Sequence, residues 1–125
     1  MRLLLDTHVF LWTVTDDPRL TTDARRLIVD ADEVYVSAAS IWEAAIKAGL
    51  GKIRGDMTQL ANAIGGSGFV VLPVTALHAA SVVELPHYHR DPFDRLLIAQ
   101  ALTEPLVLLT SDAKLPQYSD IVRLV

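Results

Sequence analysis

The chain has 125 residues, of which 51% are hydrophobic and 21% are charged, a composition typical of one compact folded domain spanning residues 1–125. It has no cysteine, which excludes disulfide scaffolds, thiolate metal sites and cysteine nucleophiles. The net charge of −4 argues against a broad basic binding surface, but it is compatible with carboxylates gathered around a metal ion. Asp6 interrupts the apolar start of the chain, and no apolar run approaches the roughly 18 residues of a membrane span, so we expect a cytoplasmic protein.

Short, wholly apolar runs alternate along the chain with segments of helical periodicity. The runs predict strands at Leu3–Leu5, Val34–Val36, Phe69–Leu72 and Leu106–Leu109, and Ile121–Leu124, which includes Arg123, predicts a fifth strand at the sheet edge. The periodic segments predict helices at His8–Val14, 21–31, Ala38–Ala48, Met57–Ile64, Thr75–Leu85 and Pro92–Leu102, then one turn at Asp112–Leu115 that Pro116 stops. Wholly apolar strands alternating with helices indicate an α/β fold with a parallel sheet covered on both faces.

Four acidic residues fall at the sheet edge where ligands are expected, because open parallel sheets bind them just beyond the carboxyl ends of their strands. Asp6 directly follows the first predicted strand, and Asp112 lies three residues after the fourth. Glu43 and Asp94 lie in early turns of helices that begin at the same edge. We therefore expect the four carboxylates to converge.

Each acid also has an interpretation that requires no chemistry. Asp6 and Asp112 can cap the turns that follow them, as Asp91 can cap the next helix. Asp94 lies in the first turn of that helix, where the helix dipole favours a negative charge.

Glu43 can simply pair with Lys47 one helical turn later. Its neighbours favour a more specific role, because a helix face that only meets solvent would carry more polar residues than Ile41, Trp42 and Ile46.

Converging carboxylates would need a cation. Two of them about 4 Å apart repel by roughly 4 kcal/mol at an effective dielectric constant near 20. Oxygen ligands without cysteine suit Mg²⁺ or Mn²⁺. One or two such ions can hydrolyse a phosphodiester without a serine or histidine nucleophile, so the acids favour that chemistry.

Four segments carry a family resemblance: Leu4–Trp12, Ser37–Glu43, Arg90–Ala101 and Leu109–Asp112. Together they resemble the PIN-domain ribonucleases, specifically VapC-type toxins, and the most specific signal is the run DPFDRLLIAQA that starts at Asp91. The resemblance implies a three-layer α/β/α sandwich around a parallel sheet of about five strands. It also implies a homodimeric, Mg²⁺- or Mn²⁺-dependent endoribonuclease, neutralised by a VapB-type antitoxin and brought to DNA only through that antitoxin.

The resemblance also assigns roles to the acids. Asp6, Glu43, Asp94 and Asp112 match the four catalytic acids of the family in chain order. By this match Asp6, Asp94 and Asp112 bind the metal, directly or through water, and Glu43 assists a metal or orients the attacking water.

Several neighbouring residues have two interpretations. Thr7, Ser37 and Thr110 can bind carboxylates and metal waters, or cap helices. Arg95 can contact a phosphate or form a surface salt bridge. The cations expected to hold RNA are Lys47, Lys52, Arg54, Arg90 and Arg95.

Other signals carry less weight. The segment Gly49–Lys52 lacks the spacing of a phosphate-binding loop. His87, His89 and Asp91 have metal-ligand spacing, but they share one loop without an evident distant ligand, so we discount zinc binding.

Two tryptophans have apolar neighbours at helical spacing. We expect Trp12 and Trp42 to belong to the core or to a subunit interface. The resemblance implies an apolar groove for the antitoxin, and Trp12 and the helix around Leu27 either contribute to that groove or belong to the core.

Three other functions compete with this interpretation. A receiver-like signalling domain would need an acid after the third strand, which instead ends at Leu72-Pro73-Val74. A catalytically inactive binding module with the PIN fold would have no chemical need for four acids. A deoxyribonuclease or flap nuclease usually carries further acids and DNA-binding helices, for which this chain has little room.

Overall fold

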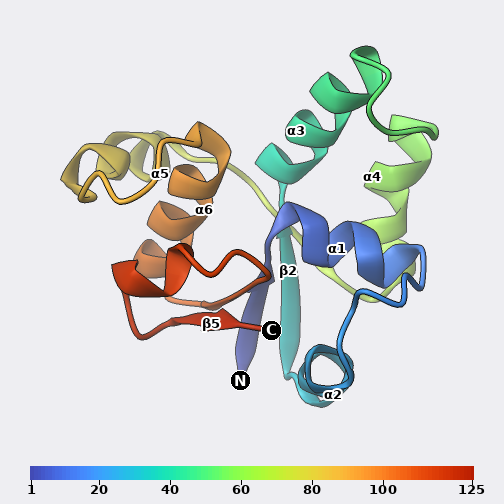
Figure 1. Cartoon of the computed structure of the whole chain (residues 1–125), viewed down its shortest axis with the longest axis horizontal. Helices are drawn as coiled ribbons and strands as arrows, with labels where there is room; N and C mark the ends of the chain where they lie inside the picture. Colours follow the sequence, from blue (N-terminus) through green and yellow to red (C-terminus); the bar gives the residue numbers. More distant parts are fainter.

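A computed structural model describes residues 1–125, and Figure 1 shows a central sheet with helices on either side. The strands are β1 (Arg2–Leu5), β2 (Glu33–Ser37), β3 (Val70–Leu72), β4 (Val107–Thr110) and β5 (Val122–Leu124). They pair in parallel in the order β3-β2-β1-β4-β5, with β5 at one edge. The predicted α/β fold with a five-stranded parallel sheet is confirmed.

Six α-helices and two short 3₁₀ helices connect the strands. They are α1 (Thr7–Val14), α2 (Thr22–Asp30), α3 (Ala38–Gly49), α4 (Met57–Gly66), α5 (Ala76–Ser81), η1 (Val82–Glu84), α6 (Pro92–Thr103) and η2 (Leu115–Tyr118). None of them combines the length and the apolar character needed to cross a membrane.

Two predicted helical segments differ in detail. The single helix expected over Thr75–Leu85 is divided between α5 and η1. The expectation that Pro116 stops a turn begun at Asp112 is wrong, because Pro116 lies inside the first turn of η2, where a helix needs no N–H donor.

Alternate residues of β1 point into two separate apolar clusters, as the pleat of a strand requires. Leu4 packs with Leu97 and Ile98 beneath α5 and α6. Leu3 and Leu5 join the cluster beneath α1, α2 and α4. Figure 1 shows these two helix layers on opposite sides of the sheet, which gives the expected three-layer sandwich.

The order of the strands brings the site together. The chain builds β1, β2 and β3 in one direction and then returns to place β4 on the other side of β1. Leu5 and Leu109 are register partners, and the Asp6 N–H donates to the Leu109 carbonyl at 3.0 Å. The residues that follow β1 and β4 therefore lie side by side at the switch point, where α/β sheets bind ligands.

Candidate active site

Asp6 is held at the junction of β1 and α1 by both of its carboxylate oxygens. Oδ1 caps α1 by accepting the Val9 N–H at 2.8 Å, and Oδ2 accepts the Thr110 hydroxyl at 2.6 Å. The residue is only 4% exposed, and this burial raises the pKa of its carboxyl group. The capping interpretation is correct, but the second oxygen is tied to β4 rather than to the helix.

Thr110 links Asp6 to Asp112. Its hydroxyl oxygen accepts the Asp112 N–H at 3.0 Å while it donates to Asp6. Asp112 Oδ1 accepts the Lys114 N–H at 2.9 Å, and its Oδ2 lies 3.3 Å from His89 Nε2. The two acids at the ends of β1 and β4 therefore share one buried hydroxyl group.

Asp94 enters the same space from the first turn of α6. The N-cap of this helix is Asp91, which accepts the Asp94 N–H at 3.0 Å, as its position predicted. Burial, followed by the negative charges of Asp91, Asp6 and Glu43, raises the pKa of Asp94 to about 7, against a smaller opposing contribution from its hydrogen bond with His89. The Asp94 carboxylate therefore lies in a concentrated negative field.

Glu43 reaches the site from α3. It is buried, its Oε1 accepts the Thr7 hydroxyl at 2.7 Å, and its Oε2 lies 3.0 Å from Lys47 Nζ. The predicted helical ion pair is confirmed, and Glu43 also faces inward toward Thr7. Ser37 caps α3 through the Ala39 N–H, without a bond to an acid.

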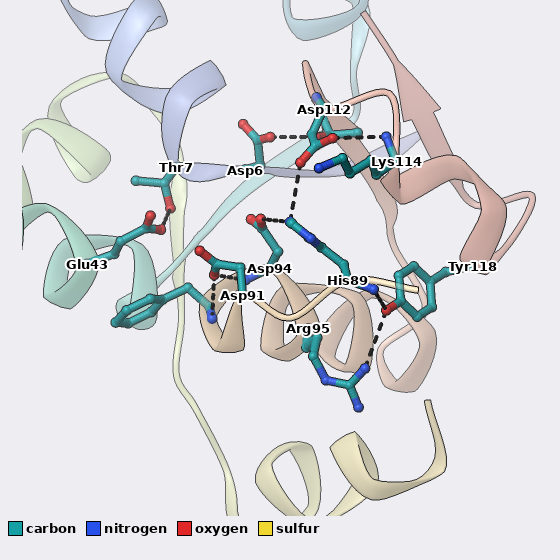
Figure 2. A network of polar contacts seen from close by, with 12 residues as sticks. Asp6, Thr7, Glu43, His89, Asp91, Asp94, Arg95, Asp112, Lys114 and Tyr118 are labelled. Carbon is teal, nitrogen blue, oxygen red and sulfur yellow. Dashed lines mark hydrogen bonds and ion pairs between the residues drawn. The ribbon is translucent and has the colours of Figure 1, made fainter. Parts of the chain in front are cut away.

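Figure 2 shows Asp6, Asp94 and Asp112 facing one another from three elements, with Glu43 and Thr7 on the side of α3. The predicted convergence is present in part: Asp94 and Asp112 come within metal-ligand distance of each other, whereas Asp6 and Glu43 lie outside that group and act on Asp94 through their charge.

His89 lies among these acids, a placement that the sequence reasoning missed. Its Nε2 is 3.0 Å from Asp94 Oδ2, and one ligand-type atom from each of His89, Asp94 and Asp112 lies within 4.8 Å of the others. The spacing along the chain pairs His89 with His87 and Asp91 in one loop. In the fold its neighbours are instead Asp94, from α6, and Asp112, which follows β4. Its position just before a helix that begins at the acidic edge was the available signal.

Arg95 has neither of its two expected roles. It is buried, and its guanidinium donates to the carbonyls of Pro86 at 2.8 Å and Val82 at 3.2 Å. It also donates to the Tyr118 hydroxyl at 3.3 Å, and this hydroxyl oxygen accepts the His89 N–H at 2.9 Å. Arg95 therefore anchors the loop before α6 instead of facing RNA or forming a surface salt bridge.

The chemistry of the donor set fits a divalent cation. Two carboxylates lie within ligand distance of an imidazole, and the pKa of Asp94 is raised first by burial and then by neighbouring negative charges that an ion would neutralise. Oxygen donors of this kind suit Mg²⁺ and Mn²⁺.

A groove of about 710 Å³ lies between α1, α4 and the segment that joins α3 to α4, and it meets the site at Lys47, the partner of Glu43. Its lining combines the apolar side chains of Trp12 and Leu60 with the cations of Lys47, Lys52 and Arg54. Leu27 does not line this groove and packs against the core cluster beneath α2, which is the second of the two alternatives for that helix.

Trp42 is not a core residue. Its side chain is 63% exposed and meets the Phe93 ring edge-on, with centroids 5.2 Å apart. The apolar sequence around it reflects an exposed stripe on α3, formed by Trp42, Ile46 and Leu50 at four-residue spacing.

Comparison with protein families matches residues 3–121 to the PIN domain. The chain belongs to the PIN domain family. This confirms the family suggested by the four sequence segments, while a comparison with curated proteins gives no match.

Solved structures share the PIN fold of this chain. VapBC2 from Rickettsia felis, bound to a DNA fragment from its promoter, aligns with a TM-score of 0.68 and 15% identity over 98% of this chain and 96% of that one. FitAcB from Neisseria gonorrhoeae aligns with a TM-score of 0.67 and 19% identity over the same shares, 98% and 96%. A toxin–antitoxin complex from Klebsiella pneumoniae aligns with a TM-score of 0.63 and 18% identity over 91% and 89%.

Proposed function

We propose that this PIN domain is a VapC-type toxin, a divalent-metal-dependent endoribonuclease that hydrolyses RNA phosphodiester bonds in the cytoplasm. The observation that supports the proposal is that Asp94 and Asp112 come within metal-ligand distance at the switch point of the sheet, with Asp6 and Glu43 close enough for their charges to act on Asp94. In this proposal residues 1–125 act as one domain.

The four acids have two different roles in this proposal. Asp6, Asp94 and Asp112 would hold Mg²⁺ or Mn²⁺, and Thr110 links the Asp6 carboxylate to the backbone N–H of Asp112. The bound ion would supply Lewis-acid activation of water and neutralise charge on the phosphate. Glu43, held by Thr7 and Lys47, would orient the attacking water and accept its proton.

RNA would approach along the groove beside α1. Lys47, Lys52 and Arg54 line it, and their charges suit phosphates of a single strand whose backbone can enter the acidic edge. Arg90 is exposed beside the site and adds a fourth cation.

A VapB-type antitoxin would occupy the same groove. The similar structures are toxin–antitoxin complexes, one of them with promoter DNA, which supports an antitoxin partner and contact with DNA only through it. An amphipathic segment fits a groove whose lining combines apolar side chains such as Trp12 with charged ones, and its binding would exclude RNA.

A homodimer would cover the exposed stripe on α3. Trp42 and Leu50 are each more than 60% exposed, and a row of large apolar side chains on one helix face is typical of a protein interface.

The test is cleavage of total cellular RNA by the isolated protein with Mg²⁺ or Mn²⁺, beside a chelator control. Asp94→Asn should abolish cleavage, whereas Asp23→Asn should not, because Asp23 also lies in the first turn of a helix but is exposed and distant from the acids. Discrete fragments that require both metal and Asp94 would support the nuclease. Absence of cleavage by folded, metal-loaded, partner-free protein would favour an inactive binding module.

A further inference from the structure

We propose that His89 is a nitrogen ligand of the divalent cation, beside Asp94 and Asp112, and that it makes the centre prefer Mn²⁺ to Mg²⁺. The inference rests on the proposed metal-dependent function and extends it to a residue outside the four acids.

The spacing of the three side chains fits adjacent ligands of one ion. His89 Nε2 lies 3.0 Å from Asp94 Oδ2 and 3.3 Å from Asp112 Oδ2. Neighbouring ligands of an octahedral ion with bonds of about 2.1 Å are about 3.0 Å apart. The same spacing fits hydrogen bonds from the imidazole to the two acids, and these two roles predict opposite effects of removing His89.

The loop that carries His89 is fixed from a distant part of the chain. Tyr118, in η2, accepts the His89 N–H at 2.9 Å, and its ring packs edge-on against Tyr88 with centroids 5.0 Å apart. Arg95 donates to the same Tyr118 hydroxyl and to the Pro86 carbonyl, so both ends of the loop are held. Because the backbone is anchored, the imidazole can bind an ion without first ordering the loop.

His87 provides an internal comparison. It lies two residues earlier in the same loop, is exposed, and is outside the cluster of ligand-type atoms. The fold therefore selects one of two neighbouring histidines and points it at the acids, as Figure 2 shows for His89.

A nitrogen donor changes which ion the centre prefers. Mg²⁺ strongly favours oxygen ligands and retains its waters, whereas first-row transition ions accept imidazole readily. A centre with His89 among its ligands should gain affinity for Mn²⁺ relative to the same centre made of carboxylates alone.

The first experiment measures binding of Mn²⁺ and of Mg²⁺ by calorimetry to the full chain, to His89→Gln and to the control His87→Gln. We expect His89→Gln to weaken Mn²⁺ binding about ten-fold or more and Mg²⁺ binding about two-fold, with both unchanged in His87→Gln. Equal losses for both ions, no loss, or tighter binding in His89→Gln would overturn the assignment, the last because the imidazole would then be a competitor of the ion.

The second experiment is pulsed electron paramagnetic resonance of Mn²⁺ bound to the unmodified chain, which does not depend on a variant folding. We expect a nitrogen coupling that persists in His87→Gln and disappears in His89→Gln. Mn²⁺ that binds without nitrogen coupling overturns the His89 assignment and leaves the metal-dependent function standing. Failure of the unmodified chain to bind either ion overturns both.

Discussion

The two halves of the acidic cluster differ in what balances their charge. On the α3 side, Glu43 has Lys47 Nζ at 3.0 Å and the Thr7 hydroxyl at 2.7 Å. On the α6 side, Asp94 lies in the field of Asp91 and Asp6, which with burial raises its pKa to about 7. The ammonium group already neutralises the first half, so a divalent cation would stabilise mainly the second.

The largest expected effect is a difference in Mn²⁺ affinity between a variant of the α6 side and a variant of the α3 side. Asp94→Asn should weaken Mn²⁺ binding about 100-fold, because it removes a ligand from the half without an ammonium group. Glu43→Gln should weaken it no more than about five-fold, since Lys47 already balances that charge. Calorimetry on the two variants checks this, and equal losses would show that the halves act as one unit.

A second prediction concerns pH. Because the pKa of Asp94 is raised from 3.8 to about 7, the folded chain retains a proton that the unfolded chain releases at lower pH. The free energy of unfolding of the metal-free protein should therefore fall as pH rises, by roughly 2 kcal/mol between pH 5 and pH 7. Urea unfolding in a chelator measures it, and Asp94→Asn should flatten the decline over this interval. A decline of the same size in that variant would assign it to other groups.

A third prediction concerns the stability that the Thr110 hydroxyl group contributes by linking the ends of β1 and β4. Thr110→Val keeps the shape but removes the hydroxyl between Asp6 and Asp112, which should cost about 1–2 kcal/mol of stability. Thr103→Val is the matched control, because its hydroxyl donates only to a carbonyl one helical turn earlier and the residue is exposed. Equal urea midpoints for the two variants would contradict a special role for the buried hydroxyl group.

The smallest expected effect on Mn²⁺ affinity concerns Tyr118, which holds the loop that carries His89 on the α6 side of the cluster. Tyr118→Phe removes the hydroxyl group that accepts from the His89 backbone N–H and from Arg95, but it leaves the imidazole in place, so Mn²⁺ affinity should fall only about three-fold. Tyr88→Phe is the control, because this neighbouring tyrosine is half exposed and contributes a ring contact. A ten-fold loss in Tyr118→Phe would mean that the position of the loop depends mainly on this hydroxyl group.

Much of the candidate site was predictable because it follows local rules. Asp6, Asp91 and Ser37 lie at helix starts with the residue types that cap helices, and the structure shows each cap. Arg95 was not predictable in the same way. An arginine in a helix start gives no local sign that its partners are carbonyls of the preceding loop, and its role depends on how that loop folds back.

The sequence by itself determined the five strands, the family and the four acids, because apolar runs, helix caps and a contiguous motif are local properties of the chain. Only the tertiary structure decided which charges meet. The position of β4 beside β1 joins Asp6 to Asp112 through Thr110, although 104 residues separate Asp6 from Thr110. The anchored loop then directs His89, and not His87, toward Asp94, because contacts between distant segments are set by packing and not by spacing along the chain.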